Sequence, residues 1–158
     1  MFIHQIVQAA SGTCVIGLFF AGAFVALPTP VQATDIAWHS KSEHVVQHGA
    51  NSERNGTIDF KTGERGSVLA YSTTHAEVNG MRPWVGISVI RFDDLSSIIV
   101  KSEGKFDPTL HVSTGSGEIL FGTGRFEGIT GKFNAIGKYS SHETVETDWS
   151  GSYSLPNK

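Results

Sequence analysis

The sequence is short of cysteine, of net charge and of helical patterning, and each shortage excludes a class of protein. Cys14 is the only cysteine among the 158 residues, so no disulfide within the chain can hold the fold together. The formal net charge is only −3, and no basic stripe suggests a nucleic-acid partner. No window keeps the apolar spacing of three and four residues that an amphipathic helix needs. These exclusions leave a protein that is built from strands and stabilised by its own hydrophobic core.

Charged side chains are also missing from the first 33 residues, because the first acidic residue is Asp35 and the first basic residue is Lys41. An unbroken run of 14 apolar or glycine residues, CVIGLFFAGAFVAL, lies within this segment. A membrane-spanning helix needs roughly 20 residues, whereas the apolar region of a signal peptide has roughly 7–15. The run therefore indicates a signal peptide. An uncleaved membrane anchor is the alternative, because Lys and Arg are absent before the run.

The end of this segment has the small residues that precede a signal-peptidase site. We predict a signal peptide over residues 1–33, cleavage between Ala33 and Thr34, and one domain over residues 34–158. The mature protein would then be secreted or periplasmic and have no stable membrane span. In a eukaryotic secretory pathway, Asn55 in the stretch Asn-Gly-Thr would also be an acceptor for glycosylation.

Strand signals recur through the rest of the chain, as runs of β-branched and aromatic residues between turn residues. The pair Asn79-Gly80 separates two such runs and favours a tight reversal of the chain. Regular spacing of short strands is typical of barrels and sandwiches. We therefore predict an all-β fold, a single antiparallel β-barrel of about eight strands, with a β-sandwich as the alternative. The seven or eight expected strands lie in residues 35–49, 67–78, 83–92, 95–106, 109–121, 125–127, 132–140 and 148–156, and a further short strand is possible at residues 57–60.

The last two expected strands alternate most clearly between apolar and polar residues. Their apolar or glycine faces hold Phe133, Ala135, Gly137 and Tyr139 in one strand and Trp149, Gly151, Tyr153 and Leu155 in the other. Successive side chains on a strand point to opposite sides. We therefore expect these faces to point into the core, and the serine-rich face of residues 148–156 to point into water.

The stretch GTGRFEGITG, residues 122–131, raises the question of a phosphate-binding loop. A dinucleotide-binding loop needs G-x-G-x-x-G between a strand and a helix. Here Glu127 stands where the third glycine belongs, and an alternating strand pattern follows Gly131. We therefore interpret the glycines as turns, bulges and close backbone approaches in a barrel, and we expect no cofactor.

The same stretch, together with the pattern W-x-G-x-Y-x-L at residues 149–155, resembles a known group of barrels. It is similar to the C-terminal part of the allene oxide cyclase and dirigent superfamily, and most of all to a bacterial group of small barrels within it. The resemblance covers about residues 115–155 and implies an eight-stranded antiparallel barrel. Its motifs are mostly turn glycines, and the family's acidic catalytic residues have no match here. Cyclase or coupling-directing activity is therefore not implied.

The histidines of residues 34–158 are scattered, and only His39, His44 and His48 form a cluster that would merit a test for metal. A zinc site needs three or four convergent ligands, and its usual short His and Cys spacings are absent. We expect no metal site. Arg125 lies between turn glycines, where it would either close a barrel end, bind an anion or be an ordinary surface residue.

Two residues are candidates for acid–base catalysis. Glu103 precedes a glycine in an apolar strand, and a carboxylate enclosed in a barrel cavity can act as a general acid. His75, near the end of the strand over residues 67–78, is the candidate histidine. The simpler interpretation of Glu103 is a solvated residue between lysines near a hairpin end.

Aromatic residues are the candidates for a ligand site, namely Tyr71, Trp84, Tyr139, Trp149 and Tyr153. A barrel of about eight strands either fills its interior with side chains or holds one small ligand. Three functions follow as hypotheses: a barrel that binds a small apolar molecule, a cyclase-like or isomerase-like enzyme with a cavity carboxylate or histidine, and a filled barrel with a structural or interaction role. A cavity of roughly 300 Å³ or more would count against the third.

Overall fold

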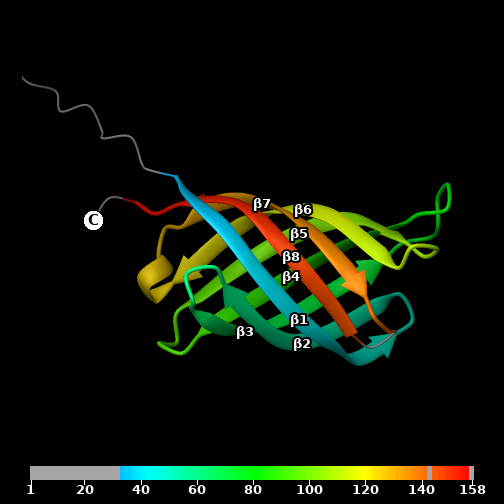
Figure 1. Cartoon of the computed structure of the whole chain (residues 1–158), viewed down its shortest axis with the longest axis horizontal. Helices are drawn as coiled ribbons and strands as arrows, with labels where there is room; N and C mark the ends of the chain where they lie inside the picture. Colours follow the sequence, from blue (N-terminus) through cyan, green and yellow to red (C-terminus); the bar gives the residue numbers. More distant parts are fainter. Residues whose placement is uncertain (1–32, 142–143, 157–158) are drawn as a thin grey trace, which may run out of the picture.

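Each strand pairs with the strands before and after it in the chain, and the first strand pairs with the last (Figure 1). The computed structural model describes residues 33–141 and 144–156. In these ranges eight antiparallel strands form one closed barrel. The all-β barrel is confirmed, and the sandwich alternative is wrong because a closed barrel has no open sheet edge. The strands are β1 (Thr34–His48), β2 (Asn51–Phe60), β3 (Arg65–Thr74), β4 (Arg82–Phe92), β5 (Ser97–Asp107), β6 (Val112–Thr123), β7 (Thr130–Tyr139) and β8 (Thr144–Ser154).

The signal-peptide prediction concerns mainly residues 1–32, which lie outside the described residues. Strand β1 begins at Thr34, the residue after the expected cleavage site. Within the described ranges, no helix combines the length and the apolar character needed to cross a bilayer. The signal peptide and the export of the protein stay predictions.

Strand β2 is longer than the sequence predicts, because it begins at Asn51 instead of residue 57. Its first half lacks the apolar alternation of a core strand. The reason is that Ser52 and Arg54, which point inward, face an internal cavity. Only Ile58, further along the same face, is fully buried.

Residues 125–127 are not the short strand that the sequence predicts. They overlap the 3₁₀ turn η1 (Gly124–Phe126), which connects β6 to β7. The amides of Glu127 and Ile129 donate to carbonyl oxygens three residues earlier, at 3.2 and 3.0 Å, as a 3₁₀ turn requires. Gly124 and Gly128 on either side have φ angles of 62° and 77°, which glycine adopts without strain.

The hydrophobic core fills one end of the barrel, where the β2–β3, β4–β5 and β6–β7 connections lie, and we call it the closed end. Phe126 of η1 is buried against this core and covers the barrel interior there. Trp149, Tyr153 and Leu155 pack against the core, so the predicted inward face of residues 148–156 is confirmed. The core residues are Ile36, Trp38, Ile58, Val68, Ile90, Phe92, Ile98, Val100, Ile119, Phe126, Ile129 and Phe133.

Two glycines of the wall make room for large rings. A Cβ atom at Gly117 on β6 would lie 2.4 Å from Cζ of Phe133, and a Cβ atom at Gly104 on β5 would lie 2.7 Å from Cζ2 of Trp84. Real Cβ contacts are longer, so each ring occupies the space that a side chain would need. Gly122, in the stretch that raised the question of a nucleotide loop, has a similar role, because a Cβ atom there would lie 2.7 Å from Cγ2 of Ile129.

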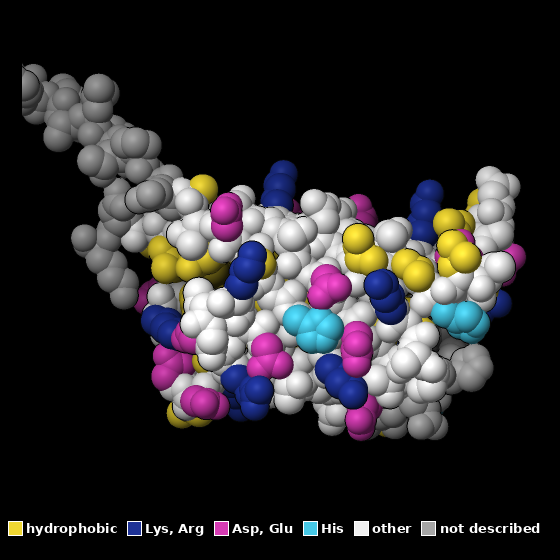
Figure 2. Space-filling model, in the orientation of Figure 1, with side chains coloured by type: hydrophobic (Ala, Val, Ile, Leu, Met, Phe, Trp, Pro, Cys, Tyr) yellow, Lys and Arg dark blue, Asp and Glu magenta, His cyan; other side chains and the backbone are white. Residues whose placement is uncertain are grey.

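The outer wall has charged side chains of both signs, and they are interspersed over the face shown in Figure 2. Several form cross-strand or local ion pairs, such as Arg65 with Asp59 at 2.7 Å and Lys41 with Glu146 at 3.8 Å. These side chains are largely exposed, so each pair contributes little to stability. The charges on the outside are thus solvated and balanced by neighbours.

Arg125 ties the connections of the closed end together. Its guanidinium pairs with Glu64 in the β2–β3 turn and with Asp94 in the β4–β5 turn. The same group lies over the rings of Phe92 and Phe126, at 4.8 and 4.7 Å from their centroids. The sequence left three roles open for Arg125. In the structure it helps to close one end of the barrel.

Asp94 should make the stability of this end depend on pH. Hydrogen bonds from the side chain and the amide of Ser96, aided by the charge of Arg125, hold the pKa of Asp94 below its usual value. A lowered folded-state pKa stabilises the fold above the unfolded pKa of about 3.9, and this contribution is lost as pH falls through the folded pKa. We expect Asp94→Asn to melt at a lower temperature than the wild type at pH 7, and the difference to shrink below about pH 4.

Thermal unfolding of both proteins between pH 7 and pH 2.5 measures this. Asp93→Asn is the matched control, because Asp93 is an exposed neighbour of the same charge. An equal deficit for Asp94→Asn at every pH would mean that the carboxylate charge is not what stabilises the turn.

Candidate ligand-binding site

The half of the barrel opposite the closed end encloses a cavity of about 850 Å³. All eight strands contribute to its wall, and the connections β1–β2, β3–β4, β5–β6 and β7–β8 surround it at the end that we call the mouth. A volume of this size lies within the range of roughly 300–1,000 Å³ that small-molecule sites have. The barrel is therefore half filled with core side chains and half hollow.

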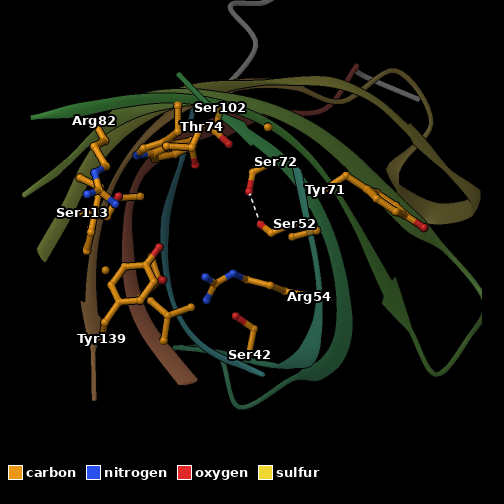
Figure 3. Close-up of a pocket in the computed structure, with 18 of the residues that line it drawn as sticks. Ser42, Ser52, Arg54, Tyr71, Ser72, Thr74, Arg82, Ser102, Ser113 and Tyr139 are labelled. Atoms are coloured by element: carbon orange, nitrogen blue, oxygen red, sulfur yellow. Dashed lines mark hydrogen bonds between the residues drawn. The ribbon is translucent and has the colours of Figure 1, made fainter. Parts of the chain in front are cut away.

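Serine side chains surround much of this cavity, which leaves it both wide and polar (Figure 3). The inward-pointing serines are Ser40, Ser42, Ser52, Ser72, Ser88, Ser102 and Ser113. Within the protein, Ser52 and Ser72 share a hydrogen bond of 2.8 Å, and Ser40 accepts one of 2.9 Å from Nε1 of Trp149. A small hydroxyl at each inward position leaves the space that a larger side chain would fill.

Four aromatic residues add apolar surface to the cavity wall: Trp84, Phe106, Tyr139 and Trp149. The rings of Phe106 and Tyr139 meet edge to face with centroids 4.9 Å apart. Trp149 lies at the boundary between cavity and core, because its ring also contacts Phe133 at 5.0 Å between centroids. The cavity thus offers both apolar rings and hydroxyl groups to an occupant.

Arg54 on β2 presents a cation to this half of the barrel. Its guanidinium carbon lies 5.0 Å from the ring centroid of Tyr139 on β7, across the cavity (Figure 3). A cation–π contact of this geometry holds the guanidinium in place. A second arginine, Arg82, also lines the cavity, but Glu77 pairs with it at 3.3 Å.

Of the five aromatic residues predicted for a ligand site, the structure brings Trp84, Tyr139 and Trp149 together around the cavity. Tyr71 contributes to the wall on β3, but its ring points out of the barrel (Figure 3). There it borders an apolar groove on the outer wall. Tyr153 packs against the core at the closed end and does not line the cavity.

The two candidate catalytic residues lie in different places. Glu103 is exposed on the outer wall, because it alternates with the buried Ser102 on β5. The hypothesis of a cavity carboxylate at Glu103 is therefore wrong and the simpler interpretation, a solvated residue, holds, since the alternation of the strand points this side chain away from the lumen. His75 lies at the mouth, where it is exposed and lines the cavity.

The histidine cluster that would merit a test for metal is not a compact one. Nδ1 of His39 lies 2.9 Å from Oδ1 of Asp148 on the outer wall, and His48 is exposed at the far end of β1. His39 and His48 are nine positions apart on β1, which corresponds to about 30 Å along the strand, so they cannot share a metal ion. The side chain of His44 lies outside the described residues. Among the described side chains, no group of three or more His, Cys, Asp or Glu is placed to hold a metal ion.

The sequence reasoning missed Arg54 and the inward serines. A signal for them was present in NSERNGTIDF, residues 51–60. If Ile58 is taken as the inward anchor of a strand, alternation puts Gly56, Arg54 and Ser52 on the same face. The polarity of that face suggested a turn-rich segment instead, because a polar inward face is unexpected unless the barrel is hollow.

Comparison of the chain with protein-family models and with curated proteins finds no match. The eight-stranded barrel agrees with the architecture that the resemblance to the allene oxide cyclase and dirigent superfamily implies. Membership of that superfamily itself stays a prediction, because turn glycines and a shared architecture do not establish descent.

Proposed function

We propose that the protein is a small-molecule-binding barrel that holds its ligand in the lumen. The observation that carries this proposal is the cavity of about 850 Å³, lined by aromatic rings and hydroxyl groups and bounded by the connections at the mouth. Eight-stranded barrels have room for one small ligand when the interior is not filled by side chains. In keeping with the predicted signal peptide, we propose that the protein acts after export.

The lining changes the class of ligand that the sequence suggested. The sequence favours an apolar molecule, because the aromatic residues are the ligand-site candidates that it reveals. The wall also has inward serines and Arg54. We therefore propose an amphipathic ligand, with an apolar part against the rings and polar atoms that bind hydroxyl groups.

The other two hypotheses have less support. A filled barrel is disfavoured by the volume of the cavity. The enzyme hypothesis loses its carboxylate candidate, because Glu103 lies outside the cavity, and keeps only His75, which is exposed at the mouth. Among the described residues, the acid that lines the cavity is Glu77, which is paired with Arg82 at the mouth.

The proposal predicts that the neutral dye N-phenyl-1-naphthylamine binds in the lumen. The dye becomes fluorescent in apolar surroundings, and energy transfer from Trp84 and Trp149 would report its position. Ala70→Phe should weaken dye binding by about tenfold or more, because a phenyl ring at this inward position occupies part of the cavity. Fluorescence titration of the wild type and the variant measures both effects.

Leu69→Phe is the matched control, because Leu69 is the adjacent residue on β3 and faces the other side of the strand. It should bind the dye as the wild type does. Absence of dye binding to the folded wild-type protein would contradict the proposal. Equal weakening by both variants would place the dye on the outer wall instead of in the lumen.

A further inference from the structure

Arg54 presents a positive charge to the lumen that none of the described acidic side chains neutralises. Its position on β2, with Ser52 and Ile58 on the same face, directs the side chain into the cavity (Figure 3). A guanidinium group stays protonated at physiological pH. In the part of the chain that the structure describes, none of the ion pairs includes Arg54.

Among the described residues, Glu77 is the only acid that lines the cavity, and it pairs with Arg82. Nη1 of Arg54 is buried and has no hydrogen-bond partner. A buried donor without a protein partner costs folding free energy unless another group satisfies it, and an anion bound in the lumen would supply an acceptor.

The surroundings of Arg54 hold the guanidinium where an anion could reach it. The ring of Tyr139 fixes one side of it through the cation–π contact at 5.0 Å. Ser42 on β1 lies opposite Gly56, so it is a diagonal neighbour of Arg54 on the inner face of the wall. The hydroxyl of Ser42 lines the cavity and makes no hydrogen bond with the described residues, so it is available to donate to an occupant.

We infer that the ligand of this barrel is an organic anion whose oxyanion group is bound by Arg54. This inference rests on the proposed function and adds the chemical class of the ligand. The planar fork of guanidinium N–H groups matches a carboxylate or a phosphate, and the bond is strong where water is excluded. The apolar part of the ligand lies against Trp84, Phe106 and Trp149, which line the same cavity.

Two fluorescent probes with nearly the same rings test the inference. The first, 1-anilinonaphthalene-8-sulfonate, has an anionic group, and the second, N-phenyl-1-naphthylamine, is neutral. Arg54→Met should weaken binding of the anionic probe by about tenfold or more, the usual effect of losing a charged hydrogen bond. It should change binding of the neutral probe by less than about twofold, because a methionine side chain retains the apolar stem.

Arg91→Met is the matched control for the change in net charge. Arg91 lies on β4, is exposed on the outer wall and pairs with no acid among the described residues. It should bind both probes as the wild type does. Arg54→Lys keeps the charge but loses the fork, and it should retain part of the affinity for the anionic probe. Near-UV circular dichroism confirms that each variant is folded.

Competition with octanoate, octyl phosphate and octan-1-ol identifies the anionic group. The inference expects octanoate or octyl phosphate to displace the anionic probe from the wild type better than octan-1-ol does, and expects Arg54→Met to lose this advantage. The stronger of the two anions shows whether the site prefers a carboxylate or a phosphate.

Three results would overturn the inference. Equal weakening of the anionic probe by Arg54→Met and Arg91→Met would mean a general effect of charge. Equal weakening of both probes by Arg54→Met would mean that the arginine only shapes the cavity. An unchanged affinity of Arg54→Met for the anionic probe would mean that Arg54 does not bind it. If the wild type bound neither probe, the proposed function would fail together with the inference. If the wild type bound the neutral probe but Arg54→Met gave one of the three results above, only the inference would fail.

Discussion

Replacing Trp149 with alanine is expected to lower the free energy of unfolding by about 3–5 kcal/mol. The ring lies between core and cavity, with centroid distances of 5.0 Å to Phe133 and 6.0 Å to Trp38. Its Nε1 also donates a hydrogen bond of 2.9 Å to Oγ of Ser40. Removing the ring would therefore uncover the inner core to the cavity and leave Ser40 without this donor. A loss of this size is a large part of a small domain's total stability of roughly 5–15 kcal/mol.

Chemical denaturation of the variants measures the effect. Ser152→Ala is the control on the same strand, because Ser152 is exposed on the outer face of β8, and its stability should change by less than about 0.5 kcal/mol. Trp149→Phe should lie between the two, because it retains ring contacts but loses the hydrogen bond, a cost of about 1 kcal/mol. If Ser152→Ala were as damaging as Trp149→Ala, the strand would be in the other register, with its faces exchanged.

The closed end of the barrel could be predicted well from the sequence. Alternation of large apolar or aromatic residues with polar ones is a direct signal of a strand with one side in a core. It placed Phe133 and Trp149 on inward faces, as the structure has them. The turn residues between strands gave the number of strands approximately, because Asn-Gly and glycine-rich connections favour reversals of the chain.

The cavity could not be predicted in the same way. An inward serine and an outward serine look alike in a sequence. The inward-pointing serines, such as Ser88 and Ser102, therefore gave no sign of a cavity. Glu103 shows the opposite error, since an acid within an apolar strand is equally compatible with either face until the register is known. The 3₁₀ turn at η1 was missed because a three-residue segment between glycines has too few positions to show a period.

Arg54 matters for stability as well as for binding. Nη1 of this cation is buried and has no hydrogen-bond partner among the described residues, and the cation has no acidic partner among them. An unpaired buried donor costs about 1–3 kcal/mol, and the contact with Tyr139 offsets about 0.5–1 kcal/mol of this. Removing the charge while keeping an apolar side chain of similar length should therefore make the fold more stable.

We expect Arg54→Met to raise the free energy of unfolding by about 1–2 kcal/mol in the absence of ligand. Thermal and chemical unfolding of the wild type, Arg54→Met and Arg91→Met measure this, and Arg91→Met should stay within about 0.5 kcal/mol of the wild type. Addition of octanoate should then reverse the order or narrow the gap, because a ligand that binds only the folded state stabilises the protein that binds it more tightly. A loss of stability in Arg54→Met would mean that the guanidinium contributes more through its contact with Tyr139 than its burial costs. If Arg54 lowers stability in the free protein and raises it when an anion is bound, then anion binding explains why an arginine lies in the lumen.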